Sequence, residues 1–448
     1  MSALETLAQD RPDIYAGLPL CIPESPEEIA GLQSRRKRIA VERARRSSFW
    51  RPRLEGIDID RLDDPEEWSK IPVLTKDRLR AMSDEQFYGE FCTLDGAAIC
   101  EYWRSGGSTG KPLFYPKTFE DILFNMVGFT RTFAAAGIED GENHRAHVST
   151  PLGVHPVGHM WARAAQIMGM GAVWAGSGAS LPSVQQLALI SSLEPTVWLG
   201  MSSYGLHLSN LANSEGVDLA GGSVSTMLCS AEALSAAKRE KLERDWGATV
   251  FDCFGMTEIS MLAAEGPSRQ GFRIWTDLAV FEVLDPDTGK PVPDGEPGHL
   301  VCTSLFGNNG APFLRWDSGD IVIMNPAAGD DGAFSVFPTM RHAHRTAGFF
   351  KLRGVNVNHQ EFEDMMFEHR SVNDFKLELI GDASGLESLR VSVEPRRGAD
   401  IDALREDLER RTKATFELSP DIVILEPGVL AREFEASVKA PRFIDRRR

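Results

Sequence analysis

The sequence lacks the features that mark secreted, membrane-spanning and nucleic-acid-binding proteins. Its 448 residues include only six cysteines, which form no CxxC pair and are too sparse for a disulfide framework. No stretch approaches the roughly 18 apolar residues that a membrane-spanning helix needs, and the first ten residues carry acidic side chains where a signal peptide has basic ones. We therefore expect a cytoplasmic protein with mostly buried, reduced thiols and no membrane partner.

Positive charge is also in short supply, with 48 Lys and Arg against 65 Asp and Glu and a net charge of −17. Binding to nucleic acid depends on basic side chains that neutralise phosphates, so we expect no nucleic-acid partner. The one basic segment, residues 35–53, also contains Ile39, Val41, Phe49 and Trp50. This mixture predicts a helix packed on one side with solvated arginines on the other, and a patch for nucleic acid or anionic membrane is the alternative.

The length and the 42% hydrophobic content predict more than one domain. From about residue 146, short apolar runs alternate with segments of helical periodicity, which predicts an α/β fold with helix-covered sheets of largely parallel strands. In such sheets ligands bind at the carboxyl ends of the strands. The expected strands are residues 146–149, 172–175, 196–200, 225–229 and 248–253, and the expected helices are residues 157–170, 184–193 and 233–246.

The pattern changes after about residue 340. Residues 375–379, 390–393 and 422–425 read as strands, and Ile401, Leu404 and Leu408 repeat like one face of a helix. We predict a large domain over residues 1–343 and a small, mobile α+β domain over residues 344–448, with a hinge at about 345–348.

The strongest local signal is a glycine-rich loop that ends in a lysine. Its glycines let the backbone approach a ligand, and its hydroxyls and ammonium add donors, so the loop is suited to hold a polyphosphate. The kinase-type P-loop is excluded because Ser105 stands at the first glycine position and Pro112 at the Mg²⁺-binding hydroxyl. The loop consists of Ser105, Gly106, Gly107, Ser108, Thr109, Gly110 and Lys111.

Five further segments follow the loop in order. With it, they make the chain from about residue 33 onward resemble the acyl-adenylate-forming enzymes, and within them the phenylacetate–CoA ligase family. The segments are Cys229-Ser230-Ala231-Glu232, Asp252-Cys253-Phe254-Gly255-Met256-Thr257-Glu258, Arg315-Trp316-Asp317-Ser318-Gly319-Asp320, His344-Arg345 with Arg353-Gly354-Val355-Asn356, and Lys439-Ala440-Pro441-Arg442-Phe443-Ile444-Asp445.

The resemblance implies a set of nucleotide contacts. The loop would hold the β- and γ-phosphates of ATP, and Thr257 would donate to the α-phosphate. Glu258 would be a ligand of Mg²⁺, which prefers hard oxygen ligands. Asp320 would accept hydrogen bonds from both ribose hydroxyls. The adenine side would be formed by Ser230, Ala231 and Glu232 together with the segment Asp252, Phe254, Gly255 and Met256.

The resemblance also implies roles for the C-terminal part. Lys439 would be the catalytic cation at the charge that develops during adenylation, Arg345 would contact the nucleotide at the hinge, and Gly354 would line the CoA tunnel. Ala347-Gly348 replaces an acidic pair that the family usually has after the arginine. The sequence therefore gives less support to the transfer to CoA than to the adenylation step.

The acid pocket is the least defined part. His147, His155 and His159 lie in one segment and are expected to line the substrate pocket rather than to bind zinc, because no partner carboxylate or cysteine accompanies them. Four of the other site residues could instead have purely structural roles: Asp320 ending a strand, Glu258 capping a helix, Phe254 in the core and Lys439 in a solvated basic tail.

We therefore expect an enzyme: an AMP-forming acid–CoA ligase that uses ATP, Mg²⁺ and CoA. It would activate an aromatic or arylacetic acid to acyl-AMP, release pyrophosphate, and pass the acyl group to CoA. The alternatives are an adenylating enzyme that serves a carrier protein or an amine, and a nucleotide-binding regulatory protein. The sequence leaves open which acid is used and whether the protein is a homodimer.

Overall fold

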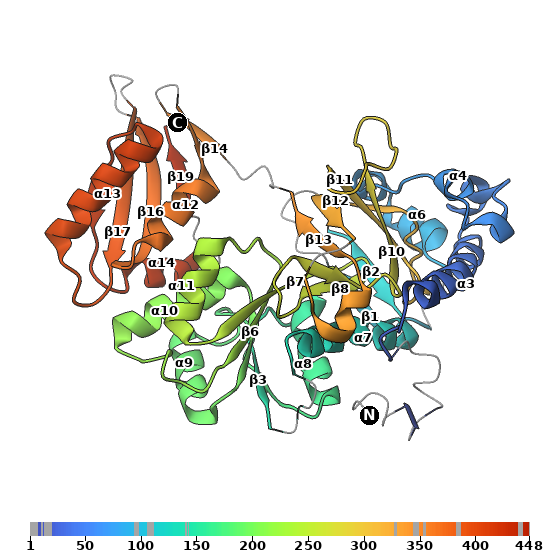
Figure 1. Cartoon of the computed structure of the whole chain (residues 1–448), viewed down its shortest axis with the longest axis horizontal. Helices are drawn as coiled ribbons and strands as arrows, with labels where there is room; N and C mark the ends of the chain where they lie inside the picture. Colours follow the sequence, from blue (N-terminus) through green and yellow to red (C-terminus); the bar gives the residue numbers. More distant parts are fainter. Residues whose placement is uncertain are drawn as a thin grey trace. The chain divides into compact units, whose positions relative to one another are not determined.

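The computed structural model describes residues 8–9, 12, 20–93, 98–104, 112–138, 141, 143–326, 329–343, 349–352, 355–381, 387–437 and 442–447. These form two compact units (Figure 1). Unit 1 holds the described residues within 1–146, 151–173 and 251–345, and unit 2 holds those within 147–150, 174–250 and 346–448. Residues 344–348 lie outside the described ranges, so the expected domain boundary stays a prediction.

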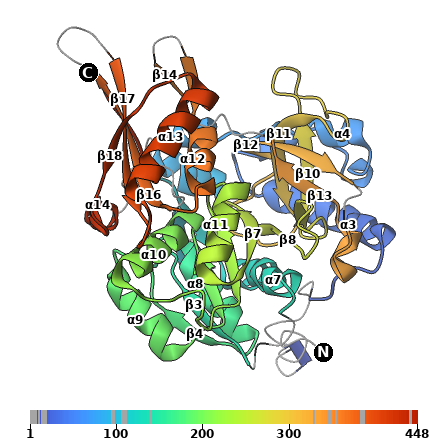
Figure 2. The same cartoon turned by 60° about the vertical axis from the view of Figure 1, so that its left-hand side comes forward.

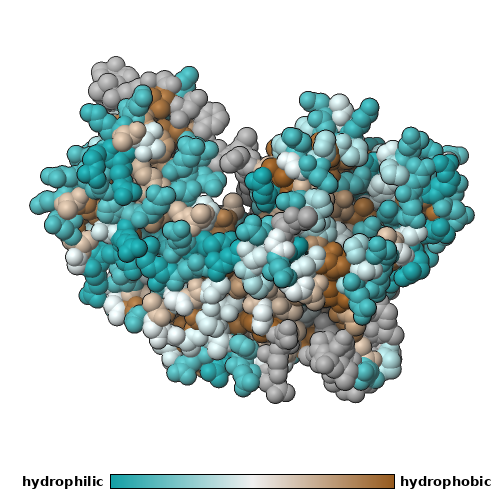
Figure 3. Space-filling model, in the orientation of Figure 1, coloured by the Kyte–Doolittle hydropathy of each residue, from teal (hydrophilic) through white to brown (hydrophobic). Residues whose placement is uncertain are grey.

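The basic segment of unit 1 begins in helix α3 (Pro26–Ala44), which Ser25 caps by accepting a hydrogen bond from the Glu28 backbone. Ile29, Val41 and Ala44 are buried, and the surface over α3 is hydrophilic (Figure 3). The predicted one-sided helix is thus confirmed. The helices that follow are short: η1 (Arg51–Leu54), η2 (Ile59–Arg61), α4 (Pro65–Ser69), α5 (Lys76–Arg80), α6 (Asp84–Gln86) and η3 (Phe87–Phe91).

Two strands of unit 1 flank the glycine-rich loop. β1 (Glu101–Arg104) pairs antiparallel with β2 (Phe114–Lys117). Helix α7 (Phe119–Ala135) follows β2 directly and begins at a capping box in which Thr118 and Asp121 bond to each other's backbone. Helix α8 (Pro156–Ile167) inserts Trp161 edge-on against Phe129 and Phe133 of α7.

The other strands of unit 1 form an antiparallel array in the order β10-β11-β12-β13-β9-β8-β7. Helix α7 packs closely on β8, because a Cβ at Gly128 would lie 2.2 Å from the Met261 carbonyl oxygen. The strands are β7 (Thr249–Met256), β8 (Ser260–Glu265), β9 (Phe272–Ile274), β10 (Ala279–Leu284), β11 (Pro297–Ser304), β12 (Trp316–Asn325) and β13 (Thr339–His342), with η5 (Gly332–Val336) before β13.

Unit 2 contains the predicted parallel pairing, since β5 (Val197–Gly200) runs parallel to β6 (Thr226–Ser230). The alternation predicted from the sequence is confirmed by β3 (Arg145–Val148), β4 (Gly171–Trp174), α9 (Ser183–Leu193) and α11 (Ala236–Trp246). Helix α10 (Ser202–Glu215) was not predicted; it lies beside α11 (Figure 2).

The C-terminal part of unit 2 has its own sheet, in the order β18-β17-β16-β19. Helix α12 packs on β16 and helix α13 on β18 (Figure 2). The expected α+β pattern and the α/β fold class are therefore confirmed. The elements are the hairpin β14 (Phe349–Leu352) and β15 (Val355–Asn358), α12 (His359–Glu368), β16 (Val372–Gly381), β17 (Glu387–Pro395), α13 (Ile401–Phe416), β18 (Asp421–Ile424), α14 (Val429–Ser437) and β19 (Phe443–Arg446).

Candidate functional site

The segment that ends in Glu258 forms the tip of the β7–β8 hairpin. Met256 pairs with Ser260, which leaves residues 257–259 as a three-residue turn. Gly255 makes this hairpin possible, because a Cβ there would lie 2.7 Å from the Ser260 carbonyl oxygen. The glycine thus allows the two strands to approach each other just before the turn that contains Glu258.

Glu258 is buried, with 5% of its surface exposed. The Tyr115 hydroxyl, from β2, donates to Oε1 of Glu258 at 2.8 Å, and Nζ of Lys76 lies 3.7 Å from the same oxygen. Within the described ranges, Oε2 of Glu258 has no hydrogen-bond partner. Among the described residues, the protein contacts of this carboxylate therefore all fall on Oε1.

Lys117 anchors the backbone of the same turn. Its ammonium donates to the Glu258 carbonyl oxygen at 3.0 Å and lies 5.0 Å from the centre of the Trp103 ring. Burial lowers the pKa of Lys117, and the negative charges of Asp121 and Glu258 oppose that shift. The Glu258 segment is thus held at both its side chain and its main chain.

The donor set at Glu258 fits Mg²⁺ bound together with a nucleotide. Mg²⁺ usually takes one or two carboxylates and completes its shell with water and substrate phosphates. Across the described part of the chain, no three His, Cys, Asp or Glu residues are grouped as a metal cage. A single carboxylate oxygen fits an ion that arrives with ATP, and it does not fit a resident structural metal.

Asp252 and Phe254 lie earlier on β7 and are both buried. Asp252 accepts the Cys253 backbone N–H at 2.9 Å. Phe254 packs edge-on against His342 at 5.4 Å and lies 6.1 Å from Phe272. The adenine contact of Phe254 stays a prediction, because the ring packs within unit 1 in this structure.

Asp320 lies on β12 and is partly exposed, and its backbone N–H donates to Ser318 at 3.0 Å. Gly319 before it has a φ of 77°, a left-handed backbone conformation that favours glycine. The ribose contact of Asp320 stays a prediction from the sequence.

In unit 2, Ser230, Ala231 and Glu232 form the turn that follows β6. Ala231 has a φ of 73°, and the Ser230 hydroxyl is buried without a hydrogen-bond partner in the described structure. Glu232 accepts hydrogen bonds from the Ser202 hydroxyl at 2.7 Å and from the Ser203 backbone N–H. Because Met201 cannot cap α10 with its side chain, Glu232 serves as the cap from a distant loop.

The remaining nucleotide and CoA predictions fall on residues that the structure does not describe. They are Ser105, Gly106, Gly107, Ser108, Thr109, Gly110, Lys111, Arg345, Gly354 and Lys439. Their roles stay predictions from the sequence.

Of the three histidines, His155 and His159 belong to unit 1 and His147 belongs to unit 2. His155 and His159, in unit 1, contact the main chain: Nδ1 of His155 lies 3.0 Å from the carbonyl oxygen of Arg104 at the end of β1, and Nε2 of His159 lies 2.9 Å from that of Gly153. His147, in unit 2, is fully buried against Gln186 at 3.2 Å, and burial lowers its pKa to about 4. It is therefore neutral at physiological pH.

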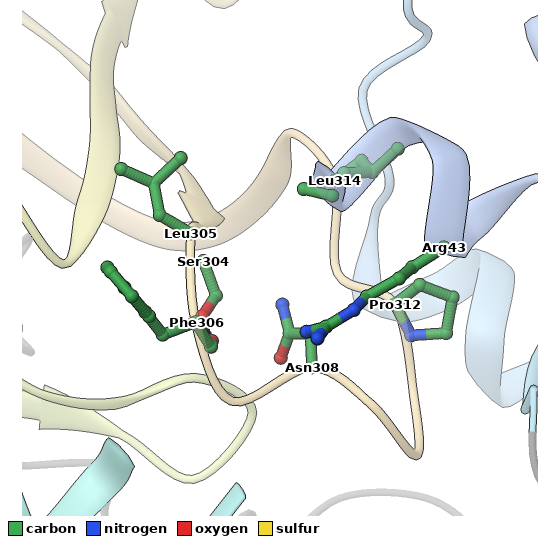
Figure 4. Close-up of a pocket in the computed structure, with 8 residues that line it drawn as sticks. Arg43, Ser304, Leu305, Phe306, Asn308, Pro312 and Leu314 are labelled. Atoms are coloured by element: carbon green, nitrogen blue, oxygen red, sulfur yellow. Dashed lines mark hydrogen bonds between the residues drawn. The ribbon is translucent and has the colours of Figure 1, made fainter. Parts of the chain in front are cut away.

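A small cavity lies elsewhere in unit 1, between α3 and the loop after β11 (Figure 4). Arg43, Phe306, Asn308 and Leu314 are among its lining residues, and its volume of about 10 Å³ has room for one water molecule. This cavity is too small for an aromatic acid and is not a substrate pocket.

Three residues of the Glu258 cluster were not found from the sequence: Lys76, Tyr115 and Lys117. Tyr115 and Glu258 are 143 positions apart, and Lys117 and Glu258 are 141 apart. Of the three, only Lys117 could have been recognised from the sequence. It stands between an aromatic strand segment and a helix cap, where a buried lysine is unusual.

Comparisons with known proteins agree with the motifs. Residues 92–306 match the family model described as AMP-binding enzyme. The phenylacetate-coenzyme A ligase of Thermus thermophilus is 27% identical over 91% of this chain and 94% of its own length. The ligase of the same name from Escherichia coli K12 is 27% identical over 94% of this chain and 96% of its own length.

Solved structures support the same fold. A 2-hydroxyisobutyryl-CoA ligase superposes with a TM-score of 0.76 at 22% identity, over 95% of this chain and 91% of that one. The matches to the family model and to the two phenylacetate-coenzyme A ligases confirm the resemblance to the acyl-adenylate-forming enzymes. Within that class, they confirm the resemblance to the phenylacetate–CoA ligase family along almost the whole chain. In the described residues, no helix is long and apolar enough to cross a membrane.

Proposed function

We propose that this protein is an ATP- and Mg²⁺-dependent acid–CoA ligase that acts on an aromatic or arylacetic acid. The alignment with phenylacetate–CoA ligases carries this proposal, because it runs over 91–94% of the chain and includes the C-terminal part as well as the AMP-binding region. The isolated AMP-binding region alone would support nucleotide binding and leave the acceptor open.

In the first step, a carboxylate oxygen of the acid attacks the α-phosphorus of ATP. The bond from that phosphorus to the bridging oxygen breaks, and pyrophosphate leaves with the electron pair. Negative charge grows at the α-phosphate, where Thr257 would donate and Lys439 would place its ammonium. A bound Mg²⁺ supplies charge neutralisation at the phosphates, and Glu258 is the residue that would hold it.

In the second step, the CoA sulfur attacks the acyl carbon of the bound acyl-AMP. The C–O bond to AMP breaks, AMP leaves with the electron pair, and the thiol proton passes to solvent or a base. Gly354 would leave room for the pantetheine arm, since it has no side chain. Arg345 would keep its contact to the nucleotide during the change of the small domain.

The remaining nucleotide contacts are assigned by motif. The loop from Ser105 to Lys111 would hold the β- and γ-phosphates, and Asp320 would hold the ribose. Phe254 and the Ser230–Glu232 turn would face the adenine. We place the acid near the segment that contains His147, His155 and His159. The six free cysteines favour a reducing compartment, which supports the cytoplasm as its location.

A pyrophosphate-release screen tests this proposal. Aryl, arylacetic and short aliphatic acids are offered with ATP and Mg²⁺, each with and without CoA, and thioester is detected by mass spectrometry. We expect release with an aromatic or arylacetic acid and a CoA thioester only when CoA is present. Release without any thioester would instead favour a carrier-protein or amine acceptor, and no release with any acid would contradict the proposal.

A further inference from the structure

The ring of Tyr115 is held by apolar packing in the interior of unit 1. The residue is fully buried on β2. Its ring packs edge-on against Phe313 at 5.5 Å and against Phe87 at 6.2 Å. These contacts leave the ring little freedom, so the direction of its hydroxyl is set by the core and not by the hydroxyl's own partner.

That hydroxyl lies 2.8 Å from Oε1 of Glu258. A buried carboxylate is strongly disfavoured unless its oxygens are hydrogen-bonded or paired with a cation. Tyr115 and the more distant Lys76 satisfy Oε1. Among the residues described, no protein group donates to Oε2, which makes it the candidate oxygen for a divalent cation.

The main chain of Glu258 is held as firmly as its side chain. The Lys117 ammonium donates to the Glu258 carbonyl oxygen at 3.0 Å, and Gly255 sets the start of the turn. With the carbonyl and Oε1 both fixed, the remaining freedom of the carboxylate is small. Rotation about the final C–C bond of the side chain would exchange Oε1 and Oε2, and the Tyr115 hydrogen bond opposes it.

We propose that Tyr115 is a positioning residue for Glu258: it holds Oε1 so that Oε2 alone is presented to the divalent cation that accompanies the nucleotide. The inference rests on the proposed function, in which Glu258 binds that cation. The sequence alone did not indicate it, because Tyr115 lies outside the glycine-rich loop. Partners that orient a metal ligand in this way typically change metal affinity by about 10–100-fold when they are removed.

The direct test is the binding of Mn²⁺, as a paramagnetic stand-in for Mg²⁺, to the full chain with a saturating non-hydrolysable ATP analogue. We expect Tyr115→Phe to weaken Mn²⁺ binding about tenfold or more. Binding of the analogue without a divalent cation should change less than about twofold, because Tyr115 acts through the carboxylate and not on the nucleotide. Unchanged Mn²⁺ affinity in Tyr115→Phe would overturn the proposal.

Two further variants separate positioning from loss of structure. Tyr204→Phe removes another buried hydroxyl, which lies 2.9 Å from Ser183 in unit 2, and should leave Mn²⁺ affinity unchanged. 4-Aminophenylalanine introduced at position 115 keeps an N–H donor at the same place and should restore the affinity. Failure of this rescue in folded protein would contradict the proposal, and the rescue variant keeps the test open if Tyr115→Phe does not fold.

A double-variant cycle completes the design. In a Glu258→Gln background, Tyr115→Phe should cause no further loss of Mn²⁺ affinity, because the ligand that it orients is already neutral. Additive losses would mean that Tyr115 acts by another route. None of these Mn²⁺-binding measurements uses an acid or CoA. Absence of acid-dependent pyrophosphate release in the wild type would therefore contradict the proposed function without deciding whether Tyr115 positions Glu258.

Discussion

Nε2 of His207 lies 2.9 Å from Oε1 of Glu435, and this contact joins α10 to α14 within unit 2. The ring of Phe434 stacks on His207 with 4.4 Å between ring centres. Helix α14 directly precedes the segment that contains Lys439. The contact therefore holds α14, the helix that precedes the proposed catalytic lysine in the sequence, against α10.

This pair gives a pH-dependent contribution to stability. Burial raises the pKa of Glu435, but hydrogen bonds from His207 and Ser183 outweigh it and leave the pKa below its ordinary value of 4.5. The folded state thus favours the carboxylate, and its contribution is full above pH 4.5 and is lost as the pH falls through the lower folded value. We expect Glu435→Gln to lower the free energy of unfolding by about 1 kcal/mol or less at pH 7, since the pair is partly exposed. The difference from the wild type should shrink in urea titrations toward pH 3; a difference that is constant with pH would contradict this assignment.

His147 should also lose stability as the pH falls, over a higher pH range than Glu435. Burial lowers its pKa to about 4, against 6.5 for an ordinary histidine. Between these two pH values the unfolded chain binds a proton at His147 and the folded chain does not. Stability is expected to fall as the pH drops from 6.5 to 4, by up to about 3 kcal/mol from this residue. His147→Gln should lose this slope. Equal slopes for variant and wild type, measured by urea unfolding at pH 4 to 7, would show that His147 does not carry it.

Arg131 and Asp277 form a buried two-pronged ion pair, with both nitrogen–oxygen distances at 2.7 Å. Asp277→Ala removes the carboxylate that pairs with this buried guanidinium, and the expected loss is about 3–5 kcal/mol in the free energy of unfolding. Asp421→Ala is the matched control, because its partner Arg390 and the aspartate itself are about half exposed. The control should cost less than about 1 kcal/mol. Similar losses in both variants would contradict the distinction between buried and exposed pairs.

Lys439 is expected to act in adenylation alone. Lys439→Ala should reduce acid-dependent pyrophosphate release by about 100-fold or more, while thioester formation from supplied acyl-AMP continues. Arg446→Ala serves as the control in the same basic tail, since Arg446 binds Glu378 at 2.6 Å. Pyrophosphate release that is normal in Lys439→Ala, or equally impaired in Arg446→Ala, would assign Lys439 to a solvated tail.

The hinge is tested by restoring an acidic side chain. Ala347→Asp is expected to alter the thioester step more than adenylation, because the family pattern has an acidic residue in this place. Equal effects on the two half-reactions would count against a role specific to one conformation. Rates of both half-reactions, measured separately, decide the question.

The sequence predicted local structure well where one face of an element is buried and the other is solvated. The strands before Ser149, Gly200 and Ser230 were placed within a few residues, because their apolar runs end in turn signals. Helix α10 was missed because its polar residues His207, Ser209 and Asn210 are buried together with its leucines, so no polar stripe marks an exposed face. Because these polar residues are buried, the helix lacks the periodic alternation of polar and apolar residues by which a helix is recognised in a sequence.

The candidate site shows the same division. The motif around Glu258 identified the carboxylate, because its residue types and their order are local. The partners that fix its geometry come from two distant segments, Tyr115 and Lys117 from β2 and Lys76 from α5, and only folding brings them together. Apart from β7, which was expected at residues 248–253, the antiparallel strands of unit 1 were not predicted, because the sequence pattern was read only for its parallel βα units.

The central claim is that a carboxylic acid passes through acyl-AMP on its way to a CoA thioester. Its most direct measurement uses acid labelled with ¹⁸O in both carboxylate oxygens, together with ATP, Mg²⁺ and CoA, and determines the isotope content of each product by mass spectrometry. The mechanism predicts one ¹⁸O in AMP, one in the thioester carbonyl and none in pyrophosphate. Label in inorganic phosphate with formation of ADP, or AMP that forms without any ¹⁸O, would contradict it.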